Sequence, residues 1–404
     1  MSMEKLLLTA LSVPLGDPRE EGCKMGLPLV LWGDPGIGKS ESVEAVSRFL
    51  AQYMATVFPS TCAPEDFSGI PVPDGSGGLI RICPMADVRE LCEIKEGILF
   101  IDEGTTVGST VQAALMGVVL NRRMGDLILP PNVRVLLAAN PPETAAGGHD
   151  MTTTLANRCC HVNFAPGGVS DWTDWMFDHD VGKKSLDNIY DVQKTVTDNW
   201  GLSWSSARAH VTGFMMSKGI DALHKVPEAG SSDRSRAYPT RRTWFFGTCA
   251  MATSRALKAG DQIEQTLLEG CVGDGIASEF LLWRKAADLP DPKDMIEKGW
   301  KPDTKRLDRS MAAYSALSGY VINLPRDGKK RVEAGGRSWM LFKEACKVGI
   351  GDIIYRSATE LVNSGLTAST FTEADHRNAA IEVLEKLYPQ AELLRKAVAA
   401  EKGK

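Results

Sequence analysis

The segment from Gly33 to Ser40 constrains this chain more than any other feature. It matches the pattern G-x-x-x-x-G-K-[ST] and follows the apolar run 29–32, which predicts a strand, a glycine-rich loop and a helix start. Glycines let successive backbone N–H groups turn towards a phosphate, and the positive end of the following helix faces the same anion. We therefore predict that the chain binds a nucleoside triphosphate.

Particular side chains of this loop have predictable tasks. Lys39 can reach the β- and γ-phosphates, and the Ser40 hydroxyl can coordinate Mg²⁺. The predicted cofactor-binding residues are Gly33, Asp34, Pro35, Gly36, Ile37, Gly38, Lys39, Ser40 and Glu41.

A second motif supplies two carboxylates. The apolar run 97–101 predicts a strand buried on both faces of a parallel sheet, and Asp102 and Glu103 follow at its carboxyl end, where such sheets bind ligands. Asp102 is placed to hold Mg²⁺, and Glu103 to activate a water for attack on the γ-phosphate. A further buried strand, 133–139, ends at Asn140, whose amide can orient that water.

Local patterns between these motifs predict more structure. Ser109 and Gln112 resemble a capping box at a helix start. The segment 121–129 reads as a hairpin, whereas the segment 63–84 is irregular and long for a simple connection.

Composition narrows the class of protein. The 404 residues carry a formal net charge of −5, which argues against a nucleic-acid binder that uses a broad basic face. Nine cysteines without C-x-x-C spacing favour reduced thiols and a cytoplasmic location. The apolar start, 3–13, is expected to be a helix packed beside the sheet, and no segment approaches the ~20 apolar residues needed for membrane insertion.

We expect an α/β fold with three parts. The predicted boundaries are an α/β nucleotide-binding domain at 1–165, a helical lid at 166–288 and a helical C-terminal extension at 289–404. The lid includes the segment 239–244, in which Pro239 precedes a helix that carries Arg241 and Arg242.

Together, these motifs resemble the AAA+ ATPases, and within them the MoxR group. The features specific to that group are the segment 64–72 and the hairpin 121–130, and the resemblance covers roughly Lys5 to Gly247. It implies an AAA+ domain with a five-stranded parallel sheet. It also implies that Asn140 is similar to sensor 1 and that Arg158 lies where the family has the arginine finger that acts on a neighbouring subunit.

By the same resemblance, sensor 2 is Arg241 or Arg242, and the spacing to Trp244 favours Arg242. The predicted catalytic residues are thus Glu103, Asn140, Arg158 and Arg242, with Ser40 and Asp102 as metal ligands. The chain departs from the family at Gly104, where a larger residue is usual, and at Cys159-Cys160, which replace an aromatic.

The expected function is hydrolysis of ATP, with Mg²⁺, coupled to remodelling of a protein partner by a homo-oligomeric ring of six. The resemblance suggests a partner with a von Willebrand factor A domain. Two alternatives stay open: a nucleic-acid translocase or restriction-type motor on the same core, and a nucleotide-switched scaffold that barely turns over. The segment 63–84 carries only Arg81 as a positive charge, which favours protein contact through Phe67 and Ile70 over nucleic acid. Packing of these apolar residues onto their own domain stays open as the alternative.

Overall fold

The computed structural model describes residues 2–68, 70–74, 79–83, 85–141, 149–165, 168, 169, 173, 176, 188–326 and 328–388. The chain divides into two compact units, Met1–Trp200 with Asp221–Glu279 and Gly201–Ile220 with Phe280–Lys404. The three-part division expected from the sequence stays a prediction. Within the described residues, no helix combines the length and the apolar character needed to cross a bilayer.

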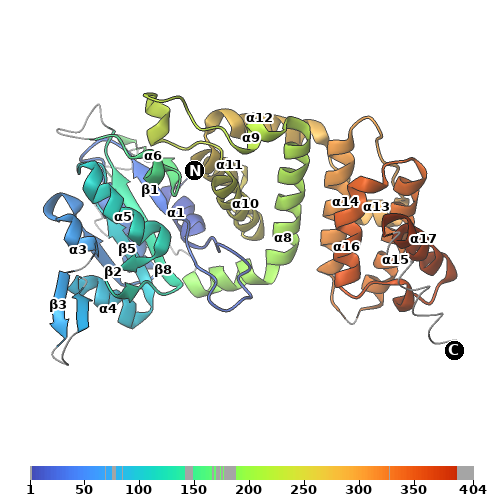
Figure 1. Ribbon diagram of the computed structural model, residues 1–404, viewed down its shortest axis with the longest axis horizontal. Coiled ribbons are helices and arrows are strands. Elements are labelled where there is room, and N and C mark those ends of the chain that lie inside the picture. The colour runs from blue at the N-terminus through green and yellow to red at the C-terminus, as the bar shows by residue number, and fades with distance from the viewer. Residues whose placement is uncertain are drawn as a thin grey trace. The chain divides into compact units, whose positions relative to one another are not determined.

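The first unit is built on a parallel sheet of five strands in the order β2-β5-β8-β1-β9 (Figure 1). This confirms the predicted five-stranded parallel sheet. The structure adds the strand order, in which β8 separates β1, the strand before the phosphate loop, from β5, the strand before Asp102. The strands of the unit are β1 (Leu29–Trp32), β2 (Met54–Val57), β3 (Ile70–Asp74), β4 (Leu79–Cys83), β5 (Glu96–Ile101), β6 (Arg123–Met124), β7 (Leu127–Ile128), β8 (Asn132–Ala139) and β9 (Cys160–Asn163).

The described helices of this unit include three that also have residues in the second unit, α8, α9 and α12. They are α1 (Met3–Leu11), α2 (Lys39–Phe49), α3 (Pro64–Ser68), α4 (Ala86–Ile94), α5 (Ser109–Asn121), α6 (Thr153–Ala156), α8 (Ile189–Lys218), α9 (Ile220–Leu223), α10 (Arg241–Ala256), α11 (Asp261–Val272) and α12 (Asp274–Ala287), with short 3₁₀ turns η1 (Pro59–Thr61) and η3 (Ser232–Ser235).

Alternate strand residues face opposite sides of the sheet, and in the three central strands both sets are buried except at the starts of β5 and β8. One face packs Val30, Leu99 and Leu137 against apolar residues of α4 and α5. The buried polar residue Arg134 of β8 holds the C-terminal end of α1, because its Nε donates to the Leu11 carbonyl at 2.8 Å. Burial lowers the pKa of Arg134 to about 10, so it stays charged at neutral pH.

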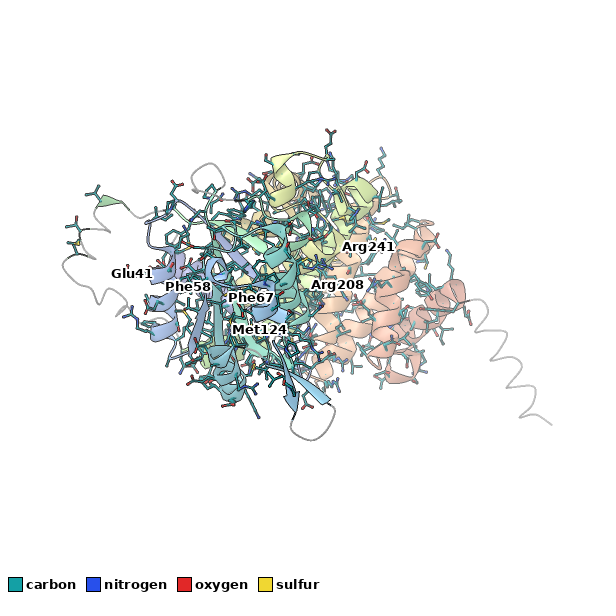
Figure 2. The ribbon with its side chains drawn as sticks, turned by 60° about the vertical axis from the view of Figure 1, so that its left-hand side comes forward. Glu41, Phe58, Phe67, Met124, Arg208 and Arg241 are labelled. Atoms are coloured by element: carbon teal, nitrogen blue, oxygen red, sulfur yellow. The ribbon has the colours of Figure 1, made fainter. Side chains whose placement is uncertain are left out.

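Two local predictions are wrong. Ser109 does not cap its helix: Gly108 is the N-cap residue of α5, and the buried Gln112 amide donates instead to the carbonyls of Val107 and Asp150. Phe67 was expected to contact a partner, but it is 2% exposed and belongs to the core of the first unit (Figure 2). Its segment forms α3, which packs beside α5, and the antiparallel pair β3–β4. The side chains of Ile70 and Arg81 lie outside the described residues.

The second unit is helical, as expected for the C-terminal region (Figure 1). Its core is aromatic: Phe342 contacts both Tyr314 and Trp339 edge-on, with ring centroids 5.5 and 5.6 Å apart. Arg208 of α8, labelled in Figure 2, forms an ion pair with Glu360 at 2.8 Å. The remaining described elements are α13 (Pro292–Lys298), α14 (Leu307–Ile322), α15 (Lys329–Lys347), η4 (Gly351–Ile354), α16 (Tyr355–Asn363), η5 (Ala368–Thr370) and α17 (Ala374–Leu387).

Candidate nucleotide-binding site

The predicted phosphate loop leaves the sheet at the end of β1 and enters α2 without interruption. Gly36 and Gly38 have φ angles of 78° and 89°, a left-handed backbone that glycine adopts at little cost. Gly38 is the N-cap residue of α2, and among the described residues no side chain caps this helix. The first turn of α2 therefore presents its positive end to the loop, as an anion site requires.

Lys39 joins the loop to the tip of β8. Its Nζ donates to the carbonyls of Gly33 (2.7 Å) and Asp34 (2.9 Å) and to Oδ1 of Asn140 (2.8 Å). The side chain is mostly buried, and this burial lowers the pKa of Lys39, while the charges of Asp102, Asp34 and Glu103 act in the opposite direction. The structure thus brings Lys39 and Asn140 into direct contact although 101 positions separate them.

Ser40 and Asp102 form the second contact across the site. The Ser40 hydroxyl donates to Oδ2 of Asp102 at 2.6 Å, and the other oxygen of that carboxylate accepts the Glu103 N–H at 2.9 Å. A hydroxyl and a carboxylate are hard oxygen donors of the kind that Mg²⁺ prefers. Their position next to the phosphate loop fits a Mg²⁺ ion that also binds phosphate oxygens.

Glu103 lies just beyond β5 with an exposed side chain and an unusual backbone. Its φ is 57°, which a residue with a β-carbon adopts only where the surroundings impose it. The surroundings do so here: its carbonyl accepts bonds from the Thr106 N–H and hydroxyl, and the Gly104 N–H donates to Ala138 on β8. The exposed carboxylate is free to meet a water.

Thr105 is a contributor that the sequence did not indicate. It is fully buried, and its hydroxyl donates to the Asn140 carbonyl at 3.2 Å. It therefore fixes the position of Asn140 relative to the Asp102–Glu103 turn. The only sequence signal for this role is a polar residue two positions after Glu103, and such a residue does not by itself indicate a contact with Asn140.

The two predicted arginines lie close to each other. Arg158 follows α6, where its Nη1 donates to the Thr154 carbonyl, and Arg242 is the second residue of α10. Burial lowers the pKa of Arg158, and the nearby charge of Arg242 lowers it further. Arg241, the first residue of α10, is exposed (Figure 2).

The site therefore has two parts. The first part is held together by hydrogen bonds and by neighbours in sequence, and it contains Lys39, Ser40, Asp102, Glu103 and Asn140. Among the described residues, no hydrogen bond or ion pair joins Arg158 or Arg242 to this group. Glu41 is exposed in the first turn of α2 (Figure 2).

Comparison with known proteins agrees with this geometry. Residues 28–159 match the model of the AAA domain, dynein-related subfamily. None of the curated proteins matches the sequence. Among solved structures, the chain resembles a candidate ATPase from Cytophaga hutchinsonii with a TM-score of 0.45 and 14% identity, over 71% of this chain and 89% of that one, a likeness from which nothing about function follows. The matched segment spans the phosphate loop, both carboxylates, Asn140 and Arg158, and the chain is therefore an ATP-hydrolysing enzyme that carries an AAA+ domain at residues 28–159.

Proposed function

We propose that the chain uses ATP hydrolysis to remodel a protein partner, as a MoxR-like AAA+ ATPase that works in a homo-oligomeric ring, most simply a hexamer. The observation that carries the catalytic part is the paired contact Lys39–Asn140 and Ser40–Asp102, with Glu103 directly beside it. These contacts bring together the residues to which this proposal gives the phosphate, the metal and the attacking water.

Each residue has a definite task in this proposal. The loop from Gly33 to Glu41 surrounds the phosphates with backbone N–H groups, and Lys39 exchanges its carbonyl partners for phosphate oxygens. Ser40 and Asp102 hold Mg²⁺, which neutralises phosphate charge and orients the γ-phosphate when bound. Glu103 accepts the proton of the attacking water, and the Asn140 amide holds that water in line.

The arginines supply the reason to propose a ring. Arg242 contacts the nucleotide of its own chain, and Arg158 completes the site of a neighbouring copy. This division of labour follows the resemblance to the AAA+ ATPases, in which the two arginines act on different subunits. An arginine of this kind contributes on the order of 10³–10⁵ to the rate in related systems.

The partner proposal rests on the hairpins of the first unit. The buried Phe67 is not available to a partner, whereas Val72 on β3 is 41% exposed and Ile128 on β7 is 62% exposed. Apolar side chains in exposed hairpins suit a protein partner, for which a von Willebrand factor A domain is our first candidate.

The described cysteines are free thiols, which supports a cytoplasmic location.

Two variants separate binding from chemistry. Lys39→Ala removes the phosphate cation and should abolish binding of a fluorescent ATP analogue. Glu103→Gln keeps the shape of the site and should bind the analogue normally, while phosphate release falls by about 10²–10⁴-fold because the general base is missing. Wild-type turnover in Glu103→Gln would contradict the assignment of this residue.

A mixing experiment tests the shared site. Arg158→Ala should bind ATP but hydrolyse it slowly, and adding Glu103→Gln subunits should partly restore phosphate release, because some interfaces then combine an intact base with an intact arginine. Full wild-type activity at a dilution where only monomers remain would refute the ring. A Glu103→Gln trap that retains DNA or RNA in ATP, and no protein, would instead support the translocase.

A further inference from the structure

The elements that carry Arg158 and Arg242 are joined cap to cap. Asn157 is the C-cap residue of α6 and Thr240 is the N-cap residue of α10. The Thr240 hydroxyl donates to Oδ1 of Asn157 at 3.1 Å, and both residues are more than nine-tenths buried, with exposed fractions of 7% for Thr240 and 8% for Asn157. Each of these residues lies within two positions of one of the two arginines.

Local chemistry fixes the Thr240 hydroxyl in this direction. Its oxygen accepts the Thr243 N–H, and the Thr243 hydroxyl accepts the Thr240 N–H in return, which makes a reciprocal capping box. The Thr243 hydroxyl also lies 3.2 Å from the Thr240 oxygen, and it can donate to the Tyr238 carbonyl at 3.0 Å, which leaves the Thr240 proton for the acceptor oxygen of Asn157. The bond between the caps is therefore directional and belongs to a rigid helix start.

The other end of α6 is tied to the same segment. The Tyr238 hydroxyl donates to the Thr153 carbonyl at 3.2 Å, two residues before the Thr240 cap. Because α6 has only four residues, bonds at both of its ends hold it as one body with the start of α10. A buried hydrogen bond also resists separation, since each freed partner would be left without water.

A third tie reaches the phosphate loop. His161 on β9 accepts the Trp32 indole N–H at Nδ1 (2.9 Å), and its Nε2 donates to the Ala156 carbonyl of α6 (2.9 Å). Trp32 directly precedes Gly33, and the Arg236 guanidinium stacks 3.8 Å above its ring. The segment before α10 therefore contacts both α6 and the strand that leads into the loop.

We propose that Asn157 and Thr240 are positioning residues that make α6 and α10 move together, so that the nucleotide state felt by Arg242 sets the position that Arg158 offers to the neighbouring subunit. This inference rests on the proposed function. It adds a physical route by which occupied sites around the ring influence one another. The route needs no contact between the two arginines and the catalytic carboxylates of their own chain.

The variants that test this proposal remove or keep the hydrogen bond between the Thr240 hydroxyl and Asn157. Asn157→Ala and Thr240→Val remove the bond between the caps, whereas Thr240→Ser keeps both the hydroxyl and the helix cap. Thr248→Val is the control, because it removes a buried α10 hydroxyl whose hydrogen bond among the described residues stays within the helix, to the Trp244 carbonyl at 2.7 Å. Thermal midpoints of all four variants separate loss of coupling from loss of folding.

Kinetics give the first measurement. We expect Asn157→Ala and Thr240→Val to keep the KM for ATP within about 3-fold, to lower kcat by roughly 3- to 30-fold and to lower the Hill coefficient towards one. Thr240→Ser and Thr248→Val should retain wild-type kcat and cooperativity. A purely stabilising role would lower the thermal midpoint without changing the Hill coefficient.

Hydrogen–deuterium exchange gives a readout that does not depend on turnover. In the wild type, a non-hydrolysable ATP analogue should protect peptides covering both 153–158 and 240–245. In Asn157→Ala, only the second peptide should gain protection. If both peptides still respond and kcat and cooperativity are unchanged, the coupling is refuted while the proposed function stands; if the wild type shows no Arg158-dependent hydrolysis, both are refuted.

Discussion

His161 is held in its neutral form inside the first unit, and we expect acid to destabilise the protein through this residue. Burial is the main cause that lowers the pKa of His161 to about 4, against an ordinary value of 6.5. The charge of Arg236 acts in the same direction, while the bond to the Ala156 carbonyl acts against it. Protonation would also place a second N–H against the Trp32 indole N–H, where His161 now accepts a bond.

The sign follows from proton binding in the two states. Between about pH 6.5 and pH 4 the unfolded chain carries the proton and the folded chain does not, so the free energy of unfolding falls as pH falls through this window. A difference of about 2.5 pKa units corresponds to about 3 kcal/mol over the whole window, of which about 2 kcal/mol is lost between about pH 7 and pH 5.

The assay compares the wild type with His161→Gln, which stays neutral and can still accept from Trp32. Native-state hydrogen exchange in urea, read from peptides of β1 and β9, gives the free energy of unfolding of this unit. The wild type should lose about 2 kcal/mol more than the variant between about pH 7 and pH 5. Equal losses in the two proteins would show that His161 is not held neutral, and would refute the reasoning.

Two further predictions concern packing. Phe67→Ala should lower the free energy of unfolding of the first unit by about 3–5 kcal/mol, because it removes a buried aromatic side chain. Urea unfolding measures this change, and a loss below about 1 kcal/mol would show that Phe67 is not part of the core. Gly97→Ala should lower the thermal midpoint or prevent folding, because Gly97 has a φ of 137° and an added Cβ would lie 2.4 Å from the Tyr53 carbonyl oxygen; a wild-type midpoint would refute this reading.

Short-range patterns predicted the central part of the site. The phosphate loop, the Asp102–Glu103 turn and the Asn140 strand end each depend on a few consecutive residues, and parallel pairing then brings the three strand ends to one edge. The same holds for the helix at the start of the chain and for the hairpin at Arg123–Ile128.

Long-range contacts explain what could not be predicted. Phe67 lies in a segment whose sequence shows no periodicity, so the sequence left open whether it packs onto its own domain or contacts a partner, and the structure buries it in α3. Gln112 fitted a capping pattern, but its amide bonds to Asp150, 38 positions away. Asn157 and Thr240 are 83 positions apart, and a bond between two helix caps leaves no trace in either local sequence.

The place of β1 inside the sheet also sets an order of events during synthesis. Leu29 pairs with Leu136 of β8 and with Cys160 of β9, so β1 has no strand partner until more than a hundred further residues have left the ribosome. At ordinary elongation rates this takes on the order of ten seconds, during which four apolar residues have no sheet to join. Lys39 also meets Asn140 only after Asn140 has been synthesised, so the contacts that assemble the candidate nucleotide site form late in synthesis.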